Sequence, residues 1–292
     1  MTDFVFAGTP TDPNLPKAYR DAVLDGANDG VLFLFDLAYR WCWAGGAPAN
    51  GDAVKDISEH ANGTLVEAAG QSVGFSDNGF DFSALTAYNS YLQIPASVAA
   101  NIWGGGTGPQ HFAITLYLTL PAKADWNPLS GLLSFLCFTT AAGGYTSEAD
   151  LVTIAQSGSG AKTITARRQL TGGSTNTGAT VTPKDADFGG VVQLLYWRNA
   201  GGQGLRLKSA NGVESQTIAP TASNTGDFSG KAGRLGVGPS FWPSSLTSAG
   251  AAKDWSIHRG WIENLATSGR DPVSVADADW GRVTGIRGNP FS

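Results

Sequence analysis

The sequence has 292 residues, with 39 glycines, nine tryptophans, 15% charged residues and a formal net charge of −5. This acidic balance argues against non-specific binding to nucleic acid. A membrane helix needs about 18 consecutive apolar residues, and the longest apolar run, at 31–43, is interrupted by Asp36 and Arg40. We therefore expect no membrane insertion. Abundant glycine and aromatic residues with little charge favour many short strands joined by tight turns.

The N-terminal residues predict an extended arm followed by one short helix. Asn14 can cap the helix, Pro16 is tolerated in its first turn, and Gly26 can end it. We expect residues 1–29 to form this arm and helix, and residues 30–292 to form a single domain. The first residues have neither the basic segment nor the long apolar segment of a secretory signal.

Apolar runs bounded by turn residues predict about a dozen strands. They are expected at 31–37 with a continuation at 39–43, and at 64–66, 88–94, 111–120, 132–139, 151–156, 163–170, 191–198, 205–209, 213–218, 232–238 and 254–265. The segments at 45–52, 172–180 and 239–253 are rich in glycine, serine or proline and are expected to be loops. Strands at this density, without alternating helices, predict an all-β sandwich or jelly roll.

The stretch 188–218 predicts a three-stranded meander at the centre of the fold. Asn211-Gly212 favours a type I′ hairpin turn, because that turn needs positive φ at both central residues. The strand at 191–198 is apolar on both faces, which indicates a central strand whose second face is covered by a loop, a helix or another subunit. Asp271 and Pro272 predict the start of a C-terminal helix.

Cysteine and histidine give little indication of chemistry. Cys42 and Cys137 lie in apolar runs without metal-ligand spacing, and we expect two buried free thiols, with a disulfide as the alternative. His111 and His258 fall within predicted strands and are expected to be partly exposed. No histidine lies beside a pattern typical of nucleophilic catalysis.

Four motifs, in order, resemble the concanavalin A-like lectin/glucanase fold in its laminin-G-like form. They are DNGFDFSALTAYNSYLQIP at 77–95, HFAITLYLTLP at 111–121, the meander from QLLYWRN to LKSANG, and GRLGVG followed by DWSIHRGWIENLATSGRDP. The ending ENLATSGRDPVSVADADW is most similar to the copies carried by tailed bacteriophages and gene transfer agents. The resemblance implies a concanavalin A-like β-sandwich with short N- and C-terminal helices.

The resemblance implies a role on the virion surface, as a tail fibre, spike or decoration protein. Such a protein is made in the host cytoplasm, which agrees with the missing secretory signal. We expect it to contact host-surface polysaccharide, to have other virion proteins as partners, and to be a homo-oligomer. The alternatives are a purely structural virion subunit, an enzyme that cleaves polysaccharide, and a secreted lectin.

Sugar binding calls for exposed aromatic rings beside polar side chains. Three tryptophans fall in predicted loops and are candidates for this role: Trp103, Trp126 and Trp242. Each can equally anchor its loop on the sandwich or face a neighbouring subunit. The tryptophans in predicted strands are expected in the core; these are Trp41, Trp43, Trp197, Trp255 and Trp261.

A calcium ion would need several oxygen ligands from one loop. Asp77, Asn78 and Asp81 form the densest group of such residues, although side chains in a turn also bond their own backbone. Calcium is the one cofactor that we consider. Glycosidases require paired carboxylates, and Glu148-Ala149-Asp150 is the only glutamate with an acidic residue two positions away. We expect no catalytic residues and a protein that is not an enzyme.

Overall fold

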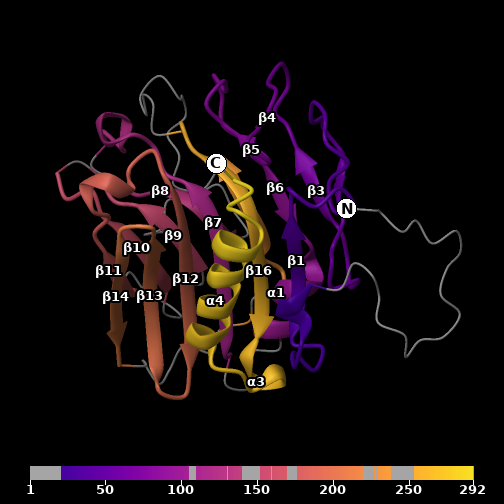
Figure 1. Ribbon diagram of the computed structural model, residues 1–292, viewed down its shortest axis with the longest axis vertical. Helices are drawn as coiled ribbons and strands as arrows, with labels where there is room; N and C mark the ends of the chain where they lie inside the picture. Colours follow the sequence, from indigo (N-terminus) through magenta and orange to yellow (C-terminus); the bar gives the residue numbers. More distant parts are fainter. Residues whose placement is uncertain are drawn as a thin grey trace, which may run out of the picture.

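Two antiparallel sheets packed face to face form the fold, as the strand pattern predicts. The computed structural model describes residues 21–104, 110–129, 131–139, 152–158, 160–169, 176–219, 227, 229–237 and 253–291. Each sheet has eight strands. In Figure 1 the sheet that contains β7, β12 and β16 lies in front, and the sheet that contains β8, β9 and β10 lies behind it. We call them the front sheet and the back sheet.

The front sheet runs β14-β13-β12-β7-β16-β5-β4, and β1 also pairs with β16. Its strands are β1 (Val31–Asp36), β4 (Gly74–Ser76), β5 (Gly79–Asp81), β7 (Phe112–Thr119), β12 (Val191–Asn199), β13 (Gly202–Ser209), β14 (Gly212–Ile218) and β16 (Ser256–Asn264). The predicted meander is confirmed as β12-β13-β14. Positive φ falls on Gly212 and not on Asn211, so the hairpin forms without the predicted type I′ turn, because Ala210 occupies the first turn position and disfavours positive φ.

The back sheet runs β11-β10-β9-β8-β15-β6-β3-β2. Its strands are β2 (Ala53–Val54), β3 (Gly63–Val66), β6 (Ser90–Ile94), β8 (Leu133–Thr139), β9 (Val152–Gln156), β10 (Ile164–Gln169), β11 (Asn176–Val181) and β15 (Ala232–Val237). Most coincide with predicted strands. β11 is a correction, because its residues were expected to be a loop. Their sequence is poor in large apolar side chains, and pairing with β10 over six residues makes the strand.

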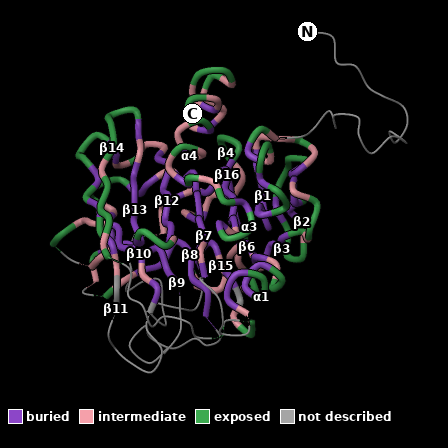
Figure 2. The backbone as a smooth tube through the Cα atoms, turned by 90° about the horizontal axis from the view of Figure 1, so that it is seen from below, coloured by how far each residue is buried: buried purple, intermediate pink, exposed green. Residues whose placement is uncertain are grey.

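Aromatic side chains from both sheets fill the space between them. Trp255, just before β16, lies 4.8 Å from the ring of Phe82 and 4.8 Å from that of Phe135 in β8. Trp103 contacts Phe112 of β7 and Phe138 of β8 at 5.2 and 5.0 Å. Figure 2 shows buried positions along the strands and exposed positions in the turns. Burial of these rings supplies much of the driving force for folding.

The described helices are short. They are α1 (Ala96–Trp103), α3 (Leu265–Ser268), α4 (Pro272–Gly281), the 3-10 turns η1 (Ala22–Leu24), η3 (Lys123–Asp125) and η4 (Asp185–Asp187), and the π-helical turn η5 (Arg282–Ile286). None combines the length and the apolarity that crossing a bilayer requires. Of the predicted N-terminal helix, only η1 lies among the described residues. The sequence did not predict α1, which begins after Pro95 without a side-chain cap.

Helix α4 covers the outer face of the front sheet (Figure 1). Asp271 caps it by accepting from the Ser274 N–H, with proline at its first position, as predicted. The side-chain amide of Gln193 in β12 donates to the Ala276 carbonyl oxygen at 2.8 Å. The prediction that a second layer covers β12 is therefore confirmed, and the cover is a helix of the same chain.

Candidate functional site

The segment after β1 forms a compact turn that presents two tryptophans. It was expected to continue the strand, but the Tyr39 N–H donates to the Asp36 carbonyl at 3.0 Å and the Cys42 N–H donates to the Tyr39 carbonyl at 2.8 Å. The Cys42 thiol donates to the Lys55 carbonyl at 3.0 Å and its sulfur accepts from the Asp36 N–H at 3.3 Å. These bonds fix the turn between β1 and β2.

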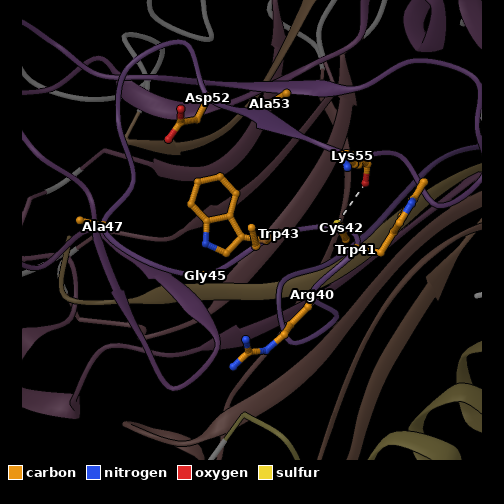
Figure 3. Close-up of a pocket in the computed structure, with 10 residues that line it drawn as sticks. Arg40, Trp41, Cys42, Trp43, Gly45, Ala47, Asp52, Ala53 and Lys55 are labelled. Carbon is orange, nitrogen blue, oxygen red and sulfur yellow. Dashed lines mark hydrogen bonds between the residues drawn. The ribbon is translucent and has the colours of Figure 1, made fainter. Parts of the chain in front are cut away.

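Trp41 is half-buried and separates two hollows. The Lys55 ammonium lies 5.5 Å from the centroid of the Trp41 ring, and the Tyr39 ring lies 6.4 Å away. The first hollow has a volume of about 260 Å³ and is lined by Arg40, Trp41, Cys42, Trp43, Ala44, Gly45, Ala47, Asp52, Ala53 and Lys55 (Figure 3). The second has about 410 Å³ and is lined by Trp41, Lys55, Asp56, Glu59, His60, Ala61 and Asn62. We call the residues of both hollows the Trp41 surface.

Trp43 lies among the lining residues of the first hollow (Figure 3). Its ring packs edge-on against Phe80 of β5 at 5.0 Å, and only 7% of the residue is exposed. Its indole N–H is buried and has no acceptor among the described residues. A buried donor without a partner is costly and calls for an explanation, such as a bound water or ligand.

A buried carboxylate holds the second hollow in shape. Asp56 is 1% exposed and accepts from the backbone N–H groups of Leu34, Ser58 and His60 at 2.9 Å each. It also accepts from the Ser58 hydroxyl at 2.6 Å and the Ala61 N–H at 3.2 Å. Because its oxygens are occupied by these donors, Asp56 orders the loop and does not serve as a ligand-binding group.

Two of the three predicted sugar-binding tryptophans are buried. Trp103 ends α1 at 0% exposure, and Trp126 is 4% exposed with its indole N–H donating to the Ser157 carbonyl at 3.2 Å. Neither offers a ring face at the surface, because Trp103 packs on Phe112 and Phe138 between the sheets, and Trp126 packs on two further phenylalanine rings. This corrects the expectation for both residues. Trp242 lies outside the described residues.

The predicted calcium ligands lie at the hairpin between β4 and β5. Asp77 and Asn78 both adopt positive φ, at 48° and 55°. The Asn78 amide donates to the Pro290 carbonyl at 2.7 Å, and the Asp81 carboxylate accepts from the Ser83 N–H and hydroxyl at 2.8 and 3.0 Å. No cluster of three or more histidine, cysteine, aspartate or glutamate side chains suited to a metal occurs in the described ranges. Calcium binding here stays a prediction.

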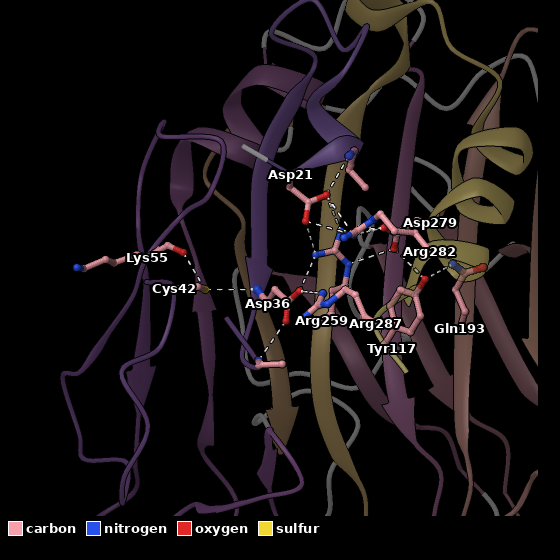
Figure 4. A network of polar contacts seen from close by, with 12 residues as sticks. Asp21, Asp36, Cys42, Lys55, Tyr117, Gln193, Arg259, Asp279, Arg282 and Arg287 are labelled. Atoms are coloured by element: carbon pink, nitrogen blue, oxygen red, sulfur yellow. Dashed lines mark hydrogen bonds and ion pairs between the residues drawn. The ribbon is translucent and has the colours of Figure 1, made fainter. Parts of the chain in front are cut away.

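The densest group of charged side chains lies beneath α4 (Figure 4). Arg259 of β16 is 0% exposed and pairs with Asp21, Asp36 and Asp279 at 2.9, 3.0 and 2.9 Å. Burial opposes its charge, but the three carboxylates outweigh burial and hold the pKa of Arg259 well above its ordinary value. Arg282 contacts Asp279 at 2.6 Å, and Arg287 contacts Asp36. Three arginines thus face three aspartates, and their mutual pairing suits a structural role.

Other residues considered for chemistry are poorly placed for it. Glu148-Ala149-Asp150 lies outside the described residues. His111 is half-buried, as expected. His258 was expected to be partly exposed but is 1% exposed, because it contacts the Thr119 hydroxyl at 2.8 Å and stacks on Phe291 at 5.0 Å. Burial lowers its pKa to about 4. Both cysteines are buried free thiols, which confirms that expectation.

Sequence reasoning missed the Trp41 surface. Trp41 and Trp43 were assigned to a strand and hence to the core, because 31–43 reads as one apolar run. Arg40 within that run was the available signal, since a charged residue between aromatics fits an exposed turn better than a core strand. Trp43 is in fact buried, as are Trp197, Trp255 and Trp261.

Comparison with known proteins shows the fold. No protein-family model and no curated protein matches the chain. A Trypanosoma rangeli sialidase in complex with sialic acid matches with a TM-score of 0.50 and 12% identity, over 88% of this chain and 33% of the sialidase. This chain thus spans about a third of that protein's length. At this identity the likeness shows a shared β-sandwich and no more.

Two weaker matches are domains of similar size. The CBM2 module of an evolved Dit protein of Lactobacillus casei BL23 phage J-1 has a TM-score of 0.40 at 11% identity, over 80% of this chain and 95% of the module. Domain 4 of an extracellular arabinanase from Geobacillus stearothermophilus, in complex with arabinotriose, has a TM-score of 0.43 at 12% identity, over 85% of this chain and 97% of that domain.

Proposed function

We propose that the protein is a non-enzymatic component of a virion surface that contacts host polysaccharide through the Trp41 surface. The observation that carries this proposal is the half-exposed Trp41 ring between two polar hollows. An aromatic ring stacks on the apolar face of a sugar, while neighbouring polar groups bind its hydroxyls. The virion setting rests on the resemblance of the closing motif ENLATSGRDPVSVADADW to copies carried by tailed phages.

Trp43 complements Trp41 in this role. Its indole N–H has no acceptor among the described residues but is shielded from solvent, so a sugar in the first hollow would reach this donor only if a neighbouring side chain moved. The ring itself is held by Phe80 and Phe75, so the donor is preorganised. The two hollows share Trp41 and Lys55, which favours a polymer that lies across the tryptophan over a single isolated sugar.

The absence of catalysis is part of the proposal. A glycosidase needs an acid and a second carboxylate across the scissile bond. In the described part of the first hollow the one acidic side chain is Asp52, and the neighbouring Asp56 is occupied by backbone donors. The buried aspartates beneath α4 pair with arginines. These arrangements support binding without bond cleavage.

The experiment measures glycan binding by the full chain and two variants. A glycan array of bacterial surface polysaccharides should give a ligand that Trp41→Ala weakens by about 1–2 kcal/mol, or about tenfold. Trp280→Ala is the matched control, since Trp280 is also half-buried but stacks on Tyr117 beneath α4. Equal binding by wild type and Trp41→Ala would contradict the site.

Further outcomes separate the alternatives. No binding to any surface polysaccharide, with the protein present in purified particles, would indicate a purely structural virion subunit. Release of reducing ends from a bound polysaccharide would show an enzyme. Binding without any association with particles would indicate a lectin outside a virion. Other virion proteins and a second copy of the chain remain expected partners.

A further inference from the structure

We infer that the first hollow of the Trp41 surface selects sugars that carry a carboxylate, so its ligand is an acidic polysaccharide. This inference rests on the proposed function and names its ligand class. It starts from the juxtaposition of two cations with the half-buried ring: Arg40 and Lys55 both line the first hollow beside Trp41.

Neither cation has an ion-pair partner among the described residues. Both side chains are exposed, and the Lys55 ammonium lies 5.5 Å from the centroid of the Trp41 ring. In the front sheet, by contrast, Arg206 and Lys208 of β13 share Asp277. Arg40 and Lys55 thus differ from these cations in having no carboxylate partner among the described residues.

The acidic side chains nearby do not cancel this charge. Among the described residues, Asp52 is the one acidic residue that lines the first hollow, and its Oδ2 accepts from the Ala49 N–H at 2.8 Å. Glu59 lines the second hollow and not the first. Asp56 is directed into its own loop by five donors. The hollow thus carries two positive groups against one negative group, in a chain whose net charge is −5.

The arrangement fits one acidic sugar unit. Figure 3 shows Arg40 extending on one side of Cys42 and Lys55 lying on the other, with Trp41 and Trp43 on opposite sides of Cys42. A guanidinium binds a carboxylate through two parallel N–H donors, and these charge-assisted bonds are stronger than neutral ones. The ring of the sugar would then stack on Trp41.

The test compares acidic polysaccharides with their carboxyl-reduced forms, in which the carboxylate becomes a hydroxymethyl group. Polygalacturonate, alginate and hyaluronan are titrated against the full chain by calorimetry, each beside its reduced form. We expect at least one acidic polymer to bind about tenfold more tightly than its reduced form, with an affinity that falls as salt rises from 50 to 300 mM.

Two variants assign the effect to the hollow. Arg40→Gln with Lys55→Gln should remove the preference for the acidic polymer, so that the ratio of its affinity to that of the reduced form falls from about tenfold to about one. The matched control is Lys123→Gln with Lys184→Gln, which removes two exposed cations elsewhere. If the acidic and reduced polymers bind with equal affinity and Trp41→Ala abolishes the binding of both polymers, the acidic ligand class is wrong and the proposed function stands. If Trp41→Ala binds both polymers as wild type does, the acidic ligand class and the proposed function are both wrong.

Discussion

Arg259 is a fully buried cation whose charge is balanced by aspartate side chains around it. Its guanidinium donates to both oxygens of Asp279, at 2.9 and 3.1 Å, and to both oxygens of Asp21, at 2.9 and 3.0 Å. A fully buried charge is tolerated only when such partners are present. Removal of the guanidinium leaves three carboxylates facing one another.

The first prediction follows from this pairing. Arg259→Met should destabilise the fold by about 3–5 kcal/mol, because it leaves buried carboxylates without their partner. Lys123→Met, which breaks an ion pair exposed at 47% and 82%, should cost less than about 1 kcal/mol. Urea denaturation measures both. Similar midpoints for the two variants would show that the Arg259 cluster contributes little to stability.

His258 gives the second prediction, which concerns pH. Burial lowers its pKa from 6.5 to about 4, although the nearby carboxylates of Asp77 and Asp36 oppose this shift. The folded state therefore binds a proton less readily than the unfolded state. This contribution to stability is complete above about pH 6.5 and decreases as pH falls towards 4. At about 1.4 kcal/mol for each pKa unit, it amounts to about 3 kcal/mol.

The variant His258→Gln isolates this effect. Urea denaturation at several pH values should show that wild type loses stability between pH 6.5 and 4, and that the variant loses about 3 kcal/mol less over the same interval. Asp21, Asp187 and Asp277 have lowered pKa values, and their losses come at lower pH in both proteins. Parallel curves for the two proteins would contradict the assignment to His258.

Calcium provides a third test at the scale of residues. The Asn78 amide and the Asp81 carboxylate are engaged in hydrogen bonds with Pro290 and Ser83. If calcium binds this loop in place of these bonds, 5 mM calcium should raise the midpoint of thermal unfolding, and EDTA should reverse the rise. Asp81→Asn should abolish the rise, and an unchanged midpoint in wild type would contradict the calcium prediction.

At the scale of elements, the pairing of β12 with β13 depends on a glycine, Gly204, which has no side chain. Trp197 lies opposite Gly204, and a Cβ atom on Gly204 would come within 2.3 Å of the Trp197 ring. The large indole thus occupies the space that the glycine leaves on the neighbouring strand. Neither residue can be enlarged without moving the other.

Gly204→Ala should therefore destabilise the protein by about 1–3 kcal/mol through overpacking. Gly281→Ala is the control, since nothing lies within 4 Å of its Cβ position at the end of α4, and alanine favours helix. We expect a neutral or slightly stabilising effect there. Thermal unfolding of the two variants compares them directly, and an equal effect at both positions would contradict the packing account.

Elements that depend on local patterns were predictable, and those that depend on tertiary contacts were not. β12 was predicted with its covered second face, because apolar residues on both faces require two layers. α1 was not, because Ala96–Trp103 has no capping side chain and is held by burial of Val98, Ala99, Ile102 and Trp103. The turn at 39–43 was missed because aromatic residues there mimic a strand.

At the scale of the whole molecule, both ends of the described chain meet on one face of the front sheet. Asp21 comes from the N-terminal side, Asp279 from α4 and Arg282 from the start of η5; Asp21 and Asp279 contact Arg259, and Arg282 contacts both carboxylates (Figure 4). The network therefore ties the first described residues to the last helix. A domain boundary near residue 29 stays a prediction, and Asp21 is already integrated with the sandwich.

The sandwich and its central meander could be predicted from sequence, whereas the candidate site could not. Tryptophans in predicted loops were expected to expose their rings, but Trp103 and Trp126 are buried in the core. The exposure of Trp41 depends on how the turn after β1 is held by Cys42 and Lys55, which are 13 residues apart. Such a contact leaves no periodic signal in the sequence.

The crystal structure of the protein with a fragment of the polysaccharide that it binds is the most direct test of the central claim. We predict a sugar ring stacked on Trp41. A fragment bound elsewhere on the sandwich, with the Trp41 surface uncovered, would contradict the account.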